Sequence, residues 1–165
     1  MKEQLKPLQL KDFDFSNRKG GGPGNETEAM TIVSTHLNKQ FVKSPDGNKQ
    51  KLFINLGEKI SLYCLYSKEN KNINTSQQES YFTFREHQRL GLAGFQKNYL
   101  ALILADTSRI LLFDTDEFLN YLGRNNCKRT DQKGIRWDFH FLRGATNRIK
   151  LKETNLDVTG KLIPQ

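Results

Sequence analysis

A nearly continuous apolar run at residues 99–105, YLALILA, constrains the fold of this chain more than any other feature. A run of this length is typical of a strand that is buried on both faces of its sheet. Such a strand needs a packing layer on each side. The chain is therefore expected to form a layered domain around a central sheet.

The segments around this run predict further strands. Residues 51–56 and 60–66 are strand-like and joined in hairpin style at Gly57-Glu58, and residues 109–113 form another strand. In residues 136–142 aromatic side chains alternate with polar ones, which indicates a last strand, placed at the edge of the sheet. Residues 67–79, SKENKNINTSQQE, are polar and predict a loop.

Capping signals predict three helices, each from an N-cap residue with a glutamate three positions later. The three pairs are Asn25 with Glu28, Thr83 with Glu86, and Asp114 with Glu117. The first helix is expected to reach about residue 40, and the third to end at Gly123. The order of elements predicts an α/β fold with a mixed central sheet flanked by helices.

The chain is expected to contain one domain, residues 25–165, preceded by a flexible basic arm. Residues 1–24 contain two prolines and the run Gly20-Gly21-Gly22-Pro23-Gly24, which favours neither helix nor strand. The glycine run lacks the Lys-Ser/Thr that follows in a phosphate-binding loop. We find no apolar run long enough to span a membrane and no signal peptide, so a cytoplasmic protein is expected.

The charge of the chain favours a polyanionic partner. Lysine and arginine number 26 against 18 aspartates and glutamates, a net charge of +8. Such an excess attracts nucleic acid by counterion release, although many proteins are basic for no such reason. Cys64 and Cys127 form no CxxC pair, and the three histidines are scattered, which excludes an ordinary zinc module and indicates two reduced thiols.

Residues 17–122 carry a succession of short motifs. The motifs are Asn17-Arg18-Lys19-Gly20, Asn25-Glu26-Thr27-Glu28, Ser44-Pro45-Asp46, Tyr66-Ser67-Lys68, the segment YFTFREHQ at 81–88 and the segment YLALILADTSRILLFDTDEFLNYL at 99–122. In this order they resemble the restriction-endonuclease-like superfamily, the PD-(D/E)xK nucleases. Within it the chain is most similar to RecU-type Holliday-junction resolvases.

The resemblance implies a metal-dependent nuclease site. Lys68 matches the motif lysine, Asp46 the motif aspartate, Glu28 the first-helix glutamate and Gln88 the helix glutamine, so Lys68, Asp46 and Gln88 are the expected catalytic residues. Two carboxylates would hold Mg²⁺, or Mn²⁺, which activates water and offsets charge on the phosphate. The residues expected to bind nucleic acid are Arg18, Lys19, Lys71, Arg85, His87 and Arg89, and a second basic stretch contains Arg124, Lys128, Arg129, Lys133 and Arg136.

One position departs from the motif. Tyr66 stands where the family has glutamate, and a phenol is a poor ligand for Mg²⁺ at neutral pH. A carboxylate from elsewhere could take its place, and the candidates are Glu69, Glu58 and Glu28. Asp46 is also a typical turn former in Pro-Asp-Gly, and Asn55 competes with it for the aspartate position.

Three functions remain open from the sequence. The first is a structure-specific, Mg²⁺-dependent DNA endonuclease that acts as a homodimer on branched DNA in recombination and repair. The second is a DNA-binding protein that has lost its metal ligand. The third is a component of a restriction or phage-defence system.

Overall fold

The computed structural model describes residues 23–45, 51–67, 69–74, 77–104, 110–144, 146 and 148–163, with the backbone alone for 23–25 and 69–74. Its α-helices are α1 (Pro23–Leu37), α2 (Glu86–Leu90) and α3 (Thr115–Arg124), and a 3-10 turn, η2, covers Thr159–Lys161. None of the helices in these ranges has the length and apolar character that crossing a lipid bilayer requires.

Six strands form a mixed sheet, here named sheet A, in the order β1-β2-β3-β6-β7-β11. Its strands are β1 (Val42–Lys43), β2 (Leu52–Asn55), β3 (Ile60–Tyr66), β6 (Lys97–Ile103), β7 (Ile110–Asp114) and β11 (Leu162–Ile163). The central pair, β3 and β6, is parallel, and the other neighbours are antiparallel. The segment that connects β3 to β6 contains two strands of the second sheet, β4 (Glu69–Asn74) and β5 (Gln77–Arg85).

That second sheet, sheet B, is antiparallel and runs in the order β10-β9-β5-β4, with β8 also paired to β9. Its strands are β4 (Glu69–Asn74), β5 (Gln77–Arg85), β8 (Lys128–Asp131), β9 (Gly134–Arg143) and β10 (Ile149–Leu151). β5 and β9 pair along most of their length, from Gln78 opposite Arg143 to Arg85 opposite Arg136. Sheet B therefore joins the middle of the chain to its C-terminal third.

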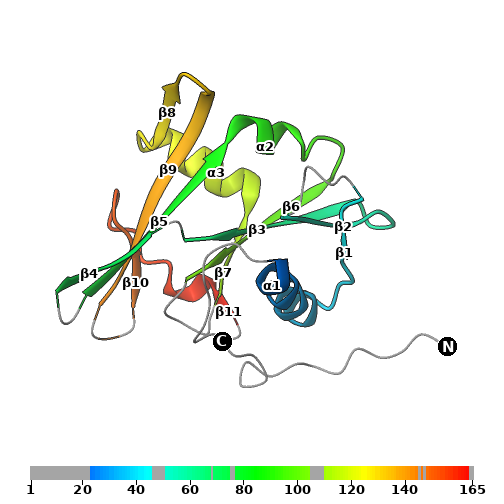
Figure 1. The fold of residues 1–165 in the computed structure, drawn as a ribbon, viewed down its shortest axis with the longest axis horizontal. Helices are drawn as coiled ribbons and strands as arrows, with labels where there is room; N and C mark the ends of the chain where they lie inside the picture. Colours follow the sequence, from blue (N-terminus) through cyan, green and yellow to red (C-terminus); the bar gives the residue numbers. More distant parts are fainter. Residues whose placement is uncertain are drawn as a thin grey trace.

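Sheet A lies between two packing layers (Figure 1). Helix α1 covers one face, where Ala29, Ile32 and Val33 pack with Leu62 and Ile103. Sheet B and α3 cover the other face, and their residues form a second core with those of β6 and β7. Leu100, Ala101, Leu102 and Ile103 have no exposed surface, which confirms the prediction of a strand buried on both faces.

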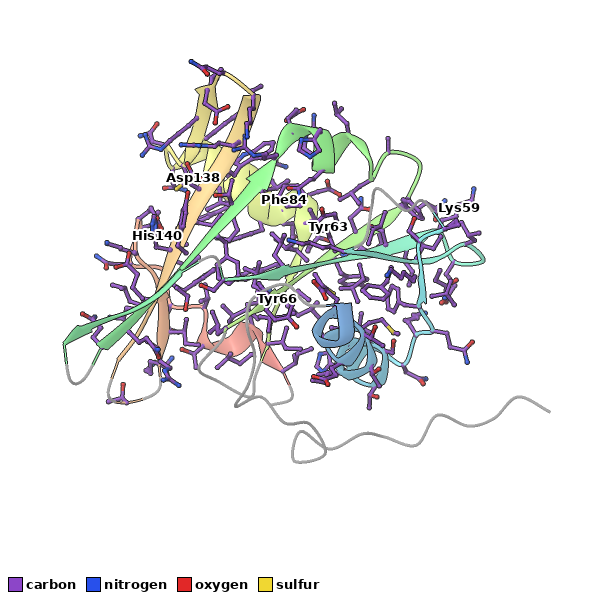
Figure 2. All side chains as sticks on the ribbon, in the orientation of Figure 1. Lys59, Tyr63, Tyr66, Phe84, Asp138 and His140 are labelled. Atoms are coloured by element: carbon purple, nitrogen blue, oxygen red, sulfur yellow. The ribbon has the colours of Figure 1, made fainter. Side chains whose placement is uncertain are left out.

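Aromatic rings fill the space between the two sheets. Phe82, Phe84, Trp137, Phe139 and Phe141 all point inward from β5 and β9, and none is more than 4% exposed. From sheet A, the Tyr63 ring meets Phe84 edge-on with ring centroids 5.5 Å apart (Figure 2). The alternation of aromatic residues in 136–142 therefore correctly identified the inward face of β9.

The prediction of a loop at 67–79 was wrong, because β4 and the start of β5 form a hairpin there. β4 pairs only with β5, so it is an edge strand held by backbone hydrogen bonds. Such a strand needs no apolar face, which is why its polar sequence gave no strand pattern. The edge position predicted for 136–142 was also wrong, because β9 pairs with β5 on one side and with β8 and β10 on the other.

The helix predicted from Thr83 begins later, after Arg85. Thr83 lies within β5, opposite Asp138, and its hydroxyl donates a hydrogen bond to that carboxylate over 2.9 Å. The other two helices were predicted more accurately. Asp114 caps α3 by accepting a hydrogen bond from the Glu117 amide over 3.0 Å. α1 begins at Pro23, inside the predicted arm, where the fixed φ of proline suits a first helical turn.

Candidate functional site

Glu26 is a buried carboxylate in the first turn of α1, where the helix lies against sheet A. It falls on the same helix face as Ala29 and Val33, three and seven residues later, and this face packs on the sheet. Only 3% of Glu26 is exposed, and its Oε2 has no hydrogen-bond partner in the part of the chain that the structure describes. A buried carboxylate oxygen without a partner is costly, which makes this position a candidate site.

The electrostatic surroundings of Glu26 place it near β1, β2 and β3. Burial raises the pKa of Glu26, and its own backbone amide, Lys51 and Lys43 lower it by smaller amounts. Burial and the nearby Glu26 together raise the pKa of the Cys64 thiol on β3. The Cys64 amide donates to the Lys51 carbonyl over 2.9 Å, so the beginning of β2 lies beside the second half of β3 on this side of the sheet.

Tyr66, at the position where the nuclease motif has glutamate, faces the same side of sheet A. It belongs to the core cluster that contains Cys64 and the inward residues of α1, and it is 6% exposed. In Figure 2 its side chain lies between β3 and the α1 side of the molecule. Residue 66, where the resemblance predicts a glutamate, is thus a core tyrosine, and Glu26 supplies a carboxylate to this face from the helix.

Glu28, the glutamate predicted from the sequence, lies two residues from Glu26. At about 100° per residue, the two side chains leave the helix on nearly opposite sides. Glu28 is half-buried, and its Oε2 also has no hydrogen-bond partner in the structure. The sequence contains a signal for Glu26. Ala29 and Val33 are four residues apart on the inward helix face, and Glu26 lies on the same face one turn before Ala29.

Several predicted site residues lie outside the described residues. They are Asp46 and Lys68 of the motif and Arg18 and Lys19 of the arm, and the side chains of Glu69 and Lys71 also lie outside. The remaining carboxylate candidate, Glu58, lies in the β2–β3 turn with Asn55, whose side-chain amide donates to it over 3.0 Å. This turn is at the opposite end of β3 from Tyr66.

No group of three or more His, Cys, Asp or Glu side chains comes together as a metal site within the described ranges. The Glu26 carboxylate nevertheless fits as one ligand of a hard cation, because its buried Oε2 has no hydrogen-bond partner among the described residues. Glu28 does not share the same helix face. The described residues thus fit one ligand of a Mg²⁺ site.

Gln88, predicted as catalytic, connects α2 to sheet A. Its Oε1 accepts a hydrogen bond from the Arg85 amide, and its Nε2 donates to the Tyr63 hydroxyl, each over 2.8 Å. Tyr63 belongs to the core between the two sheets, whereas Glu26 lies on the α1 side. Gln88 and Glu26 are therefore on opposite sides of sheet A, and Gln88 caps α2 in this structure.

The three predicted nucleic-acid-binding residues with described side chains lie on or beside α2. Arg85 forms an ion pair with Asp131 over 3.4 Å, and Arg89 forms one with Glu86. The hydrogen bond and the positive charge of Arg89 lower the pKa of Glu86, so Arg89 and Glu86 both stay charged near neutral pH. His87 is exposed. Together they form part of a basic surface that continues onto β8 and β9.

Comparison of the chain with protein-family models, with curated proteins and with solved structures found no match in any of the three. The structure confirms the mixed α/β class and the mixed central sheet. No neighbour identifies the restriction-endonuclease-like family.

Proposed function

We propose that this protein is a metal-dependent endonuclease that acts on DNA, with Glu26 as a ligand of the metal. The observation that carries the proposal is the buried Glu26 carboxylate, whose Oε2 has no hydrogen-bond partner within the described ranges. It faces the side of sheet A on which Tyr66 occupies the motif position. The motif resemblance over residues 17–122 and the net charge of +8 support DNA as the substrate.

The chemistry of such a site divides between the metal and the chain. A bound Mg²⁺ would activate a water and offset charge on the scissile phosphate. Glu26 contributes one oxygen ligand, and the positive charges of Lys43 and Lys51 favour its ionised form. By the resemblance, Lys68 stabilises the developing charge and Asp46 adds a second carboxylate. The same resemblance proposes a homodimer in which two copies cut a branched substrate symmetrically.

The test is cleavage of a synthetic four-way junction by the full chain with Mg²⁺ or Mn²⁺. Glu26→Gln keeps the shape of the side chain but removes the charge, so cleavage should fall by about 100-fold while binding persists. Lys68→Ala should behave in the same way. Glu117→Gln is the matched control, because Glu117 is also a first-turn helix glutamate but is exposed.

Cleavage by Glu26→Gln at the wild-type rate would overturn the role of Glu26. A wild-type protein that binds DNA but cuts none with either metal would instead support a second function, a DNA-binding protein without nuclease activity. The burial of Tyr66 in the core, at the position of the motif glutamate, favours this alternative. Cutting of linear duplex at one sequence would favour a restriction component.

A further inference from the structure

A cleft opens on the far side of sheet A from Glu26, between α2, α3 and the β8–β9 hairpin. Its volume is about 430 Å³, and it is lined by Arg89 and Glu86 of α2, by Asp116 and Arg124 of α3, and by Lys128 and Trp137 of the hairpin. Figure 1 shows these elements together at one end of the molecule, with α1 on the other side of the sheet. The cleft therefore belongs to a separate surface.

The charges of the cleft favour an anion. Arg89 forms an ion pair with Glu86, and this contact, with a smaller contribution from the charge of Asp116, raises the pKa of Arg89. Arg124 and Lys128 form no ion pair in the described part of the chain, and the Lys128 ammonium lies 5.7 Å from the centre of the Trp137 ring. The cleft thus holds two cations whose charge is not neutralised by a contacting carboxylate.

The positive charge continues beyond the cleft along the hairpin. Residues 124–136 contain five lysines or arginines and a single acidic residue, Asp131. Arg129 pairs with Asp138 over 3.9 Å but its side chain is 64% exposed, Arg136 pairs with Asp131 and Asp138, and Lys133 is exposed in the turn between β8 and β9. A line of cations longer than the cleft suits a polyanion that extends past it better than a small anion confined within it.

We infer that this cleft and the β8–β9 hairpin bind the phosphate backbone of DNA, with Arg124 and Lys128 as the central contacts. Arginine and lysine are the usual partners of phosphate oxygens, and such contacts fix orientation without reading sequence. Because sheet A separates the cleft from Glu26, the DNA segment held here is not the segment at the carboxylate. The inference rests on the proposed function for its choice of DNA, and it adds a second contact surface.

The test compares two charge reversals that change the net charge by the same amount. Arg124→Glu with Lys128→Glu alters the cleft, and Lys150→Glu with Lys161→Glu alters two exposed lysines on β10 and η2, away from it. Binding to a fluorescently labelled DNA four-way junction is measured by anisotropy in EDTA, over a series of salt concentrations. Circular dichroism melting shows whether each variant is folded.

The cleft variant should bind about tenfold more weakly than the control variant, and its log K against log salt slope should be shallower by about two. The neutral pair Arg124→Gln and Lys128→Gln should show the same change of slope, in case the reversals prevent folding. Equal weakening by the cleft and control variants would overturn the inference, since net charge alone would then explain it. Tighter binding of an RNA duplex than of DNA would overturn the choice of DNA.

The outcome separates the two proposals. Loss of binding in the cleft variant with normal cleavage by Glu26→Gln contradicts only the proposed function. Normal binding by the cleft variant with loss of cleavage in Glu26→Gln contradicts only the inference that the cleft binds DNA. A wild-type protein that binds no DNA contradicts both.

Discussion

Glu26 shows how one residue can be placed at the expense of stability. Its carboxylate is almost fully buried, and the positive charges of Lys43 and Lys51 only partly offset the loss of hydration. The pKa of Glu26 is accordingly higher in the folded chain than the usual value of 4.5. A cation bound at Oε2 would remove this cost, because it would replace the missing partner.

Glu26→Gln should therefore be more stable than the wild type at neutral pH. The folded wild type retains the proton of Glu26 to a higher pH than the unfolded chain, so its stability falls as the pH rises from 4.5 through the folded pKa. Glu26→Gln has no ionisable group at this position, so its stability does not fall in this way as the pH rises. Urea unfolding between pH 4 and pH 8 measures the difference in the free energy of unfolding between the two proteins. This difference should be small at pH 4 and reach its largest value above the pKa of Glu26 in the folded chain.

Two controls sharpen this measurement. Glu117→Gln, at an exposed first-turn position, should show no comparable gain. Added Mg²⁺ should stabilise the wild type and leave Glu26→Gln unchanged, because a ligand stabilises only the form that binds it. A wild type that is as stable as the variant at pH 8 without Mg²⁺ would contradict the burial of an ionised Glu26.

Among the elements, the pairing of β5 with β9 depends on a polar network on the outer face of sheet B. Asp138, 9% exposed, accepts hydrogen bonds from the Tyr81 and Thr83 hydroxyls over 2.9 Å each. The Arg136 guanidinium lies 2.9 Å from its other oxygen. Figure 2 shows Asp138 and His140 along the same strand, and the His140 ring stacks on Tyr81 with centroids 4.6 Å apart.

Asp138→Leu should destabilise the fold by about 3 kcal/mol, because it leaves two hydroxyls and a guanidinium without their shared acceptor. Asp131→Asn is the control, since Asp131 also pairs with Arg136, over 2.9 Å, but is 28% exposed. That change should cost less than about 1 kcal/mol. Urea unfolding measures both, and equal costs would show that the buried network contributes nothing beyond a surface ion pair.

At the scale of the whole molecule, sheet A separates the two cysteines. Cys64 belongs to the core on the α1 side, and Cys127 to the core on the side of sheet B. Both are free and buried, as the sequence predicted for reduced thiols. Burial raises the pKa of each thiol, which disfavours the reactive thiolate.

Neither thiol should react quickly with a thiol reagent such as DTNB in the native protein. In guanidinium chloride both should react, giving two equivalents at a rate about 100-fold higher, because unfolding removes the protection of both cores. The single variants Cys64→Ser and Cys127→Ser assign each reaction. A thiol that reacts rapidly in the native state would show that its core is open to solvent.

The sequence alone determined the features that depend on local patterns. The apolar run at 99–105 required a layer on each side of its strand, the aromatic alternation at 136–142 defined the inward face of β9, and Asp114 with Glu117 specified the start of α3. These features could be predicted because burial on one or both faces and side-chain capping each require a recognisable pattern of residue types within a short stretch of sequence.

Only the tertiary structure decided which segments meet. β4 is polar and held by backbone pairing, Thr83 is kept in β5 by its contact with Asp138, and Glu26 is buried because α1 lies on sheet A. Sheet A also separates Glu26, which the sequence did not single out, from the predicted Gln88 and from the cleft on the other side. Contacts between residues far apart in the chain carry no local pattern, because their energy depends on packing that exists only in the folded state.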